Sequence, residues 1–390
     1  MVIESDVVIV GGGLNGAALA CALRHGPHTV TLLEPKPPSP PALLPEGEGS
    51  DAWDSRIYAY SPGNVNWIKS QGGWSAPVRA QAVYRMRIHG DAGGDLDFDA
   101  LEAGLPELAW IAENGRLQAS LWQSLSDTPN LRVVTTPAEA VTWGDDGRHV
   151  LHLADGSTLA SRLLVAADGA NSWVRRQAGI GFLLEDYKHI GVVANFETEK
   201  PHRGAAWQWF RDDGVLAYLP LPGNRISMVW STSPEHAALL QTLSPTELAS
   251  RVARAGGHAL GELRCITSPA GFPLKRRLAD TWVRPGLVLL GDAAHTVHPL
   301  AGQGVNLGFR DSRLLAYVLK SAGDPGEIGR LTAYAARRRE DVATMQLVSG
   351  SLRKLFGRQE SLIRTLRNQG MNFADHFSPL SQALMHHAAL

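Results

Sequence analysis

The chain has 390 residues, with 37 Lys and Arg against 38 Asp and Glu, a formal net charge of −1 and two cysteines. This near-neutral balance, without a basic stripe, argues against nucleic acid as the main partner. Hydrophobic residues make up 44% of the chain, which is typical of a globular α/β protein of one or two domains, but no stretch has the roughly 18 uninterrupted apolar residues of a membrane span. Cys21 and Cys265 cannot form a disulfide framework, so we expect a cytoplasmic protein.

The first strong pattern is a glycine-rich turn that follows an apolar strand at residues 6–10. Gly11 permits a sharp turn, and Gly13 permits the backbone to approach a pyrophosphate without a Cβ. Gly16 lets the following helix pack against the strand, and the free N–H groups of the first helical turn favour phosphate. The residues predicted to contact a dinucleotide here are Gly11, Gly13, Leu14, Asn15 and Gly16.

A carboxylate follows the second predicted strand, at residues 30–33. Glu34 lies about 20 residues beyond the glycine turn, where an acid accepts hydrogen bonds from a ribose. The order of strand, glycine turn, helix and acid predicts a dinucleotide site. The alternative, a glycine-rich packing turn, leaves Glu34 without a role.

The next part of the chain continues as an α/β pattern. The expected elements are, in order, a Pro-rich loop at 35–50, a helix at 114–125, a strand at 131–134, a hairpin at 149–159 around Asp155 and Gly156, and a buried parallel strand at 163–167.

From about residue 188 the chain changes to short extended runs separated by turns. We expect an antiparallel sheet from the runs at 190–197, 205–211, 215–220 and 225–231. This sheet carries four aromatic residues that are candidates for the apolar wall of a substrate pocket, although ordinary core between two domains is an alternative reading. The four are Trp207, Trp209, Tyr218 and Trp230.

Two further carboxylates each end an apolar strand: Asp168 follows the strand at 163–167, and Asp292 follows one at 286–290. Because parallel strands end at the same edge of a sheet, we expect both beside the first glycine turn. The nearby His295 and His298 have the spacing of metal ligands, but no third ligand lies near them, so no metal site is predicted.

In their order and spacing, these motifs resemble those of the single-component flavin-dependent aromatic hydroxylases. The strongest element runs over residues 291–308, a Gly-Asp motif followed by a Pro and glycine-rich loop that opens a helix at 304–320. The resemblance implies that Asp292 binds the ribityl chain of FAD, and that the loop brings backbone N–H groups to the flavin. The loop residues concerned are Pro299, Gly302, Gln303, Gly304, Val305 and Asn306.

Residues 54–61, 115–118 and 351–390 are similar to the ubiquinone-biosynthesis branch of these hydroxylases. This implies that Arg56 lies near the flavin and that Arg116 and Gln118 lie beside the ribityl and phosphate groups. For each of the three, a surface or capping role is the alternative. Tyr60 stands where the branch commonly has Leu, which leaves the ring position and the substrate open.

The resemblance also implies a reaction. NADPH or NADH reduces FAD during a transient visit, O2 adds to carbon 4a of the flavin, and the distal oxygen passes to the ring of a prenylated phenol or quinol in ubiquinone biosynthesis. Alternatives are a hydroxylase of another aromatic compound, a flavin halogenase or prenyl reductase, and a non-catalytic flavoprotein subunit of a biosynthetic complex. An NAD dehydrogenase would leave Asp292 without a role.

We therefore expect a discontinuous Rossmann-like FAD-binding domain at 1–75, 105–180 and 281–340, an inserted antiparallel-sheet substrate domain at 76–104 and 181–280, and a helical C-terminal segment at 341–390. In the last segment, apolar residues recur near helical spacing beside basic ones. It is interpreted either as a surface that contacts a membrane peripherally or a partner complex, or as a helix packed across the two domains. The residues concerned are Leu347, Leu352, Arg353, Lys354, Leu355, Phe356, Arg358, Leu362, Ile363 and Leu366.

Overall fold

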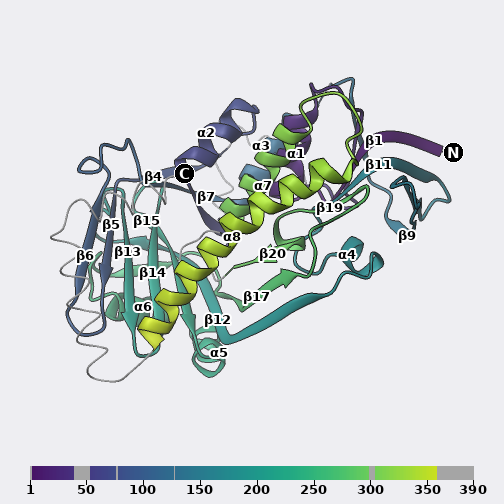
Figure 1. Ribbon diagram of the computed structural model, residues 1–390. Coiled ribbons are helices and arrows are strands. Elements are labelled where there is room, and N and C mark those ends of the chain that lie inside the picture. Colours follow the sequence, from purple (N-terminus) through teal and green to yellow (C-terminus); the bar gives the residue numbers. More distant parts are fainter. Residues whose placement is uncertain (1, 39–52, 76–77, 127, 298–303, 358–390) are drawn as a thin grey trace.

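The computed structural model describes residues 2–38, 53–75, 78–126, 128–297 and 304–357, which form three β-sheets with helices around them (Figure 1). The first sheet has eight strands, five of them parallel. The parallel strands lie in the order β19 (Leu287–Leu289), β11 (Thr158–Ala166), β1 (Val2–Val10), β2 (Val30–Leu33) and β8 (Leu131–Val134). The antiparallel additions are β18 (Val283–Arg284), β10 (His149–Leu153) and β9 (Ala138–Thr142).

Most of the predicted elements of this sheet are confirmed, with one difference. The hairpin and the buried parallel strand were expected as separate elements, but β11 is one continuous strand that serves both. It pairs in parallel with β1 along its whole length and antiparallel with β10 near its start. This continuity places the end of β11 next to the end of β1, which positions the turn that follows.

Helices pack on this sheet because their inward faces are small or apolar. Helix α1 is made almost entirely of buried small and apolar residues, and it contacts both α3 and α7. The helices of this part are α1 (Leu14–Leu23), α2 (Pro62–Ser70), α3 (Asn114–Gln123), α4 (Trp173–Gln177), the short 3-10 helix η1 (Gly291–Ala293) and α7 (Gly304–Val318).

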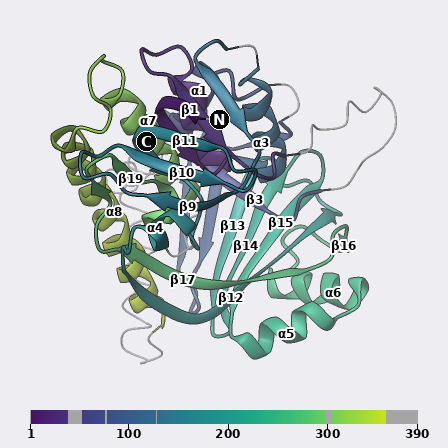
Figure 2. The ribbon, with the colours of Figure 1, turned by 90° about the vertical axis from the view of Figure 1, so that its right-hand side faces the viewer.

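The second sheet has nine strands and lies beside the first (Figure 2). Helices α5 (Pro234–Thr242) and α6 (Pro245–Ala255) cover one of its faces, and Ser244 and Glu247 form a capping box at the start of α6. Its strands, in order, are β20 (His295–Thr296), β17 (Ala270–Ala279), β12 (Phe182–Thr198), β15 (Arg225–Thr232), β14 (Gly214–Leu221), β13 (Ala205–Arg211), β5 (Arg85–His89) and β6 (Asp95–Asp99), while β16 (Leu263–Cys265) pairs with β12.

The third sheet joins the other two parts. It has three strands, β3 (Ile57–Tyr60), β7 (Ala109–Glu113) and β4 (Ala80–Val83). Ile57, Val83 and Ile111 from this sheet pack with Ala206 and Leu221 of the second sheet. These contacts use the face of the second sheet that α5 and α6 leave open. Of the strands within 76–104, β4 falls in this third sheet, while β5 and β6 fall in the second. The domain boundaries given above stay predictions.

The long helix α8 (Ile328–Gly357) crosses from the first sheet toward the second (Figure 1). Leu331, Tyr334 and Val342 are buried in the core of the first sheet. Farther along, the Oε1 atom of Gln346 accepts a hydrogen bond from Arg276 of β17 at 2.7 Å. As far as Gln346, therefore, α8 packs across both parts of the protein. The apolar and basic residues of the C-terminal segment lie outside the described side chains.

Candidate active site

Four of the predicted site residues meet at one edge of the first sheet. Strands β1, β2, β11 and β19 are parallel neighbours, and they end just before Gly11, Glu34, Asp168 and Asp292. The loops that follow are in direct contact, because Gly11 N–H donates to Leu33 O at 2.9 Å. The predicted convergence of the glycine turn with three carboxylates is therefore present in the fold.

The glycine turn is closely packed on its protein side and open on the other. Gly11 has φ 104, and a Cβ on Gly16 would lie 1.9 Å from Gly11 O. In contrast, a Cβ on Gly13 would meet no atom within 4 Å in the part of the chain that the structure describes. Gly11 and Gly16 are thus required by the fold itself, whereas the bare backbone at Gly13 borders empty space at the start of α1.

Glu34 holds the glycine turn as well as closing β2. Its Oε2 accepts from Gly12 N at 2.7 Å, and its Oε1 accepts from Lys36 N at 3.0 Å. On the other side, Gln118 Nε2 and Trp122 Nε1 donate to Gly12 O at 2.9 and 2.8 Å. The structure therefore places Gln118 at the turn through a backbone carbonyl, and it adds Trp122, which the sequence pattern did not single out.

Asp168 caps a short helix and keeps one oxygen free. Its Oδ2 accepts from Trp173 N at 2.7 Å and from Val174 N at 3.0 Å, while its buried Oδ1 has no hydrogen-bond partner among the described residues. Beside it, the buried Arg175 donates to Ala293 O at 2.7 Å and to Ala170 O at 2.9 Å. Arg175 thus ties the loop after β11 to the loop after β19.

Asp292 is the accessible carboxylate of the site. Its side chain is exposed, yet protein surrounds it closely enough that burial raises its pKa. Asp292 is therefore a carboxylate that is accessible from outside the protein although protein atoms desolvate it. The same pKa responds to His295 and Arg277, whose positive charges partly oppose the effect of burial.

A buried charge network holds the turn that carries Asp292. Asp311 of α7 accepts from Gly291 N at 2.9 Å and lies 2.7 Å from His295 Nε2, and Arg338 of α8 donates to its other oxygen at 2.6 Å. His295 is therefore an element of this network. Asp311 and Arg338 were not singled out from the sequence, although an acid on the buried face of the helix expected at 304–320 is a signal that could have identified Asp311.

Residues at the start of α7 have two different roles. No atom of the described residues would lie within 4 Å of a Cβ on Gly304, and Val305 is half-buried. The side chain of Asn306 is buried: it accepts from Ser61 N at 2.9 Å and donates to Ala59 O at 2.8 Å, so it fixes α7 against β3 and α2. The predicted residues His298, Pro299, Gly302 and Gln303 lie outside the described part of the chain.

The two predicted arginines differ in their surroundings. Arg116 forms an ion pair with Glu113 at 3.1 Å, and Arg56 is largely exposed, with its backbone N–H donating to Asp54 Oδ1 at 2.8 Å. Asp54 also accepts from Gly115 N at 3.0 Å, which joins the segment before β3 to the start of α3. Asp54 was not singled out from the sequence.

The four aromatic pocket candidates lie on the face of the second sheet that α5 and α6 cover. Tyr218 donates to Val252 O of α6 at 2.6 Å, Trp230 packs on His236 of α5 with ring centroids 5.0 Å apart, and Trp207 and Trp209 belong to the same cluster. They form core there between the sheet and its own two helices, whereas the alternative reading was core between two domains. Alternation had placed Trp207 and Trp209 correctly on one face, but it could not tell which face the helices cover.

The opposite face of the second sheet is the one that faces the site. Here Asn195 donates through Nδ2 to Asp54 O at 3.0 Å. Strand register places Gln208, Ala217, Val229 and Val193 in one row across β13, β14, β15 and β12 on this face. Within the described ranges, no three His, Cys, Asp or Glu side chains are grouped as a metal site, and no helix is long and apolar enough to span a membrane.

Comparisons with known proteins agree with this geometry. Residues 120–348 match the family described as FAD binding domain. The chain is 35% identical to the 3-demethoxyubiquinol 3-hydroxylase of Escherichia coli (strain K12), over 98% of each chain. It is 32% identical to the human mitochondrial ubiquinone biosynthesis monooxygenase COQ6, over 97% of this chain and 91% of that one. The structure of p-nitrophenol 4-monooxygenase PnpA from Pseudomonas putida shares the fold, with a TM-score of 0.78 at 19% identity, covering 99% and 97% of the two chains.

The fold and the site together define an FAD-dependent aromatic monooxygenase. The chain belongs to the family of hydroxylases of ubiquinone biosynthesis. Its cofactor is FAD, its electron donor is NADPH or NADH, and O2 is the co-substrate. An aromatic small molecule is the substrate class that this family implies.

Replacing Glu34 with Ala should lower the affinity for FAD on the order of 10- to 100-fold, because it removes a charged hydrogen-bond acceptor worth roughly 1.5 to 3 kcal/mol. The loss of the contacts to Gly12 and Lys36 acts in the same direction. Glu34→Gln keeps one acceptor oxygen and should give an intermediate affinity. Titrating apoprotein with FAD measures this, and unchanged affinity in Glu34→Ala would contradict the assignment.

Proposed function

We propose that this enzyme hydroxylates the aromatic ring of a prenylated phenol or quinol intermediate of ubiquinone biosynthesis. The observation that carries the proposal is the 35% identity, over 98% of both chains, to a protein named 3-demethoxyubiquinol 3-hydroxylase. The site supports the proposal because the residues expected to bind the flavin cofactor lie together at one edge of the first sheet. The ring position is left to experiment.

The residues at this edge fit FAD. The glycine turn and the first turn of α1 would bind the pyrophosphate, since Gly13 borders open space there, and Glu34 would accept from the ribose. The unpartnered Oδ1 of Asp168 is an acceptor that lacks a donor in the described part of the protein. Asp292 would receive ribityl hydroxyl groups, and the open space beside Gly304 would admit the ring. When bound, the flavin supplies the electron transfer and the oxygen activation.

The protein's own part in the reaction is to orient the substrate and exclude water. The row of Gln208, Ala217, Val229 and Val193 is the surface we propose for the substrate ring. Its apolar members are partly exposed, and Gln208 offers a hydrogen-bonding amide at one end. A mostly apolar wall with few polar groups suits a prenylated phenol and keeps water from the reacting atoms.

We also propose that the enzyme is cytoplasmic and works at a membrane surface or within a biosynthetic complex. The support is chemical, because a prenylated substrate partitions into lipid. The C-terminal segment is the predicted contact, and truncation after residue 345 tests it. If the truncated enzyme retains FAD and still sediments with membranes, the C-terminal segment is not the part that contacts the membrane.

Complementation of ubiquinone-hydroxylase mutants should restore quinone synthesis, with mass spectrometry identifying the intermediate that disappears. In parallel, the purified yellow enzyme should oxidise NADPH or NADH faster when that intermediate is added, and it should release a hydroxylated product. Asp292→Ala is the matched control and should fail in both assays. Flavin-replete protein without substrate-stimulated oxidation would indicate a non-catalytic subunit, and stimulation only by an unprenylated phenol would indicate another aromatic substrate.

A further inference from the structure

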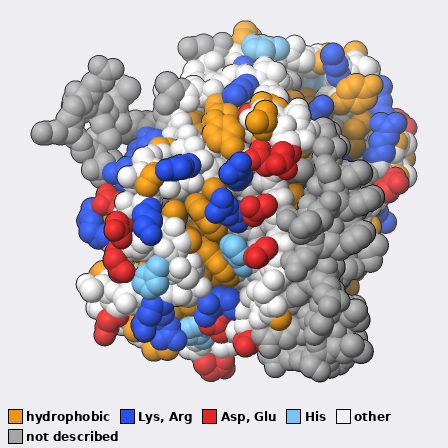
Figure 3. Space-filling view, turned by 90° about the vertical axis from the view of Figure 1, so that its left-hand side faces the viewer, with side chains coloured by type: hydrophobic (Ala, Val, Ile, Leu, Met, Phe, Trp, Pro, Cys, Tyr) orange, Lys and Arg blue, Asp and Glu red, His pale blue; other side chains and the backbone are white. Residues whose placement is uncertain are grey.

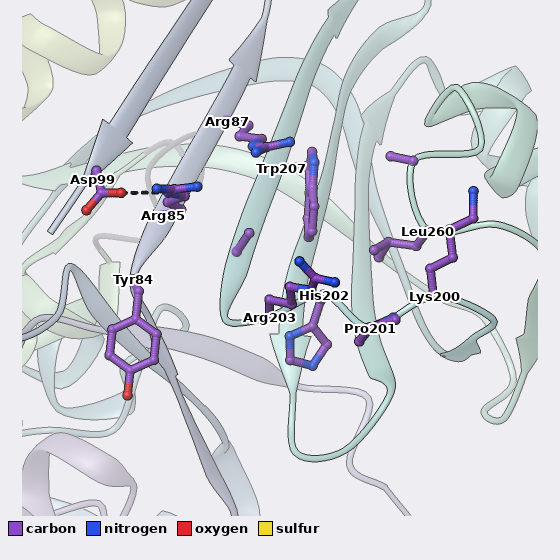
Figure 4. Close-up of a pocket in the computed structure, with 12 residues that line it drawn as sticks. Tyr84, Arg85, Arg87, Asp99, Lys200, Pro201, His202, Arg203, Trp207 and Leu260 are labelled. Carbon is purple, nitrogen blue, oxygen red and sulfur yellow. Dashed lines mark hydrogen bonds and ion pairs between the residues drawn. The ribbon is translucent and has the colours of Figure 1, made fainter. Parts of the chain in front are cut away.

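A hollow of about 590 Å³ lies on the face of the second sheet that carries α5 and α6. This is the opposite face from the proposed substrate row. In the space-filling view of this end of the molecule, Lys and Arg side chains lie next to hydrophobic ones (Figure 3). Figure 4 shows the hollow itself, and the residues that carry the argument are Tyr84, Arg85, Arg87, Lys200, Arg203 and Trp207.

Strand register brings two of the arginines to the floor of the hollow. β5 pairs in parallel with β13, so Arg85 lies beside Ala205 and Arg87 lies beside Trp207 on one face of the sheet. Arg87 therefore stands next to the indole ring of Trp207, whereas Arg85 is directed toward Asp99 (Figure 4). Arginine side chains next to aromatic rings are common where planar anions are bound.

The other two cations come from a loop that the protein holds in place. Lys200 and Arg203 lie in the connection between β12 and β13, on either side of the buried His202. The Nε2 of His202 lies 2.8 Å from Leu221 O and 2.7 Å from Gly223 O, and its Nδ1 accepts from Gly204 N at 3.0 Å. Arg203 is held at φ 52, a conformation that few residues other than glycine adopt.

The charges around the hollow do not balance. Arg85 pairs with Asp99 at 2.6 Å and Arg87 with Asp97 at 3.7 Å, whereas Lys200 and Arg203 have no ion pair with any described residue. The residues that line the hollow include four cations and one carboxylate, Asp99, while Asp97 and Glu102 act on the arginines from nearby, so cations outnumber carboxylates in a chain whose formal net charge is −1. In addition, the buried Nε of Arg87 has no acceptor within hydrogen-bond distance in the described structure.

We propose that this hollow binds the dianionic phosphate group of an organic phosphate. A phosphate monoester carries about −1.5 to −2 at pH 7, a charge opposite in sign to that of the four cations that line the hollow. Its oxygens would accept from Arg87, Lys200 and Arg203. Its organic part would lie against Tyr84, whose ring is 49% exposed, and the indole of Trp207. The ligand is either a soluble organic phosphate or the phosphomonoester headgroup of a lipid.

Calorimetric titration of the FAD-loaded enzyme with phenyl phosphate tests the site directly. We expect binding that weakens as NaCl is added. The double variant Lys200→Ala/Arg203→Ala should bind at least tenfold more weakly, and it removes only exposed side chains. The matched control, Arg132→Ala/Lys320→Ala, removes two exposed cations from elsewhere and should bind as the parent does. Flavin content and the unfolding temperature of both variants should equal those of the parent.

Vesicles distinguish the two sources of phosphate. Cosedimentation with phosphatidylcholine vesicles that contain phosphatidic acid, reversed by phenyl phosphate and reduced in Lys200→Ala/Arg203→Ala, assigns the site to a lipid headgroup. Binding of phenyl phosphate without such cosedimentation assigns it to a soluble phosphate. The proposal is overturned if neither probe binds the parent, or if the double variant binds as tightly as the parent.

Discussion

Asp311→Asn is expected to lower the free energy of unfolding by about 3 to 5 kcal/mol, because it removes the fully buried carboxylate of the Arg338 ion pair and leaves only the partly exposed Asp341 beside that guanidinium. Asp311 is 0% exposed and accepts from Gly291, His295 and Arg338 at once. An amide at this position keeps only one acceptor oxygen and turns an NH2 group toward donors. Urea unfolding of parent and variant measures the difference.

Asp341→Asn is the matched control for Asp311→Asn. Asp341 also pairs with Arg338 and lies 3.2 Å from Arg310, but it is partly exposed, so its loss should cost about 1 kcal/mol or less. Equal effects from the two variants would show that burial of the network contributes nothing.

Asp311→Asn should also change how the free energy of unfolding depends on pH. Burial on its own would raise the pKa of Asp311, but the positive charges and hydrogen bonds of His295 and Arg338 hold it below its ordinary value of 3.8. A lowered carboxyl pKa stabilises the fold above the ordinary value, and this stabilisation is lost as the pH falls through the lower, folded value. Asp311→Asn should therefore flatten the acid side of the urea-midpoint profile, and an unchanged acid side would contradict the network.

Gly16→Ala and Gly13→Ala should separate folding from cofactor binding within one turn. A Cβ on Gly16 would lie 1.9 Å from Gly11 O, so α1 must shift and the fold should lose at least about 1 to 3 kcal/mol along with FAD binding. A Cβ on Gly13 meets no atom of the described residues within 4 Å, so the apoprotein should unfold like the parent while FAD affinity falls at least tenfold. Thermal unfolding of the apoprotein measures the effect on the fold, and FAD titration measures the effect on cofactor binding. Full FAD affinity in Gly13→Ala would show that the pyrophosphate does not bind at this turn.

The parts of the site that could be predicted from the sequence are those set by local pattern and by the geometry of parallel strands. Gly11, Glu34, Asp168 and Asp292 each follow a recognisable apolar strand, and parallel strands end at one edge. The Asp311 network could not be predicted in this way, because its members are brought together by the packing of α7 and α8 rather than by spacing.

The aromatic residues of the second sheet show a different limit. Alternation along a strand separates two faces, but the identity of the covered face depends on where α5 and α6 dock. Trp230 and Tyr218 meet those helices, so the face expected to hold substrate is the other one. The resemblance implied that Gln118 lies beside the ribityl and phosphate groups, which stays a prediction, and its contact in the structure is the carbonyl of Gly12 in the glycine turn.

The position of Arg338 couples helix α8 to the turn that carries Asp292. Its guanidinium, carried by α8, binds the carboxylate that also receives the N–H of Gly291. Docking of α8 and the shape of the turn before Asp292 are therefore not independent equilibria. Because such coupling is reciprocal, a cofactor held by Asp292 as proposed would strengthen the docking of α8 by the same factor by which that docking strengthens cofactor binding.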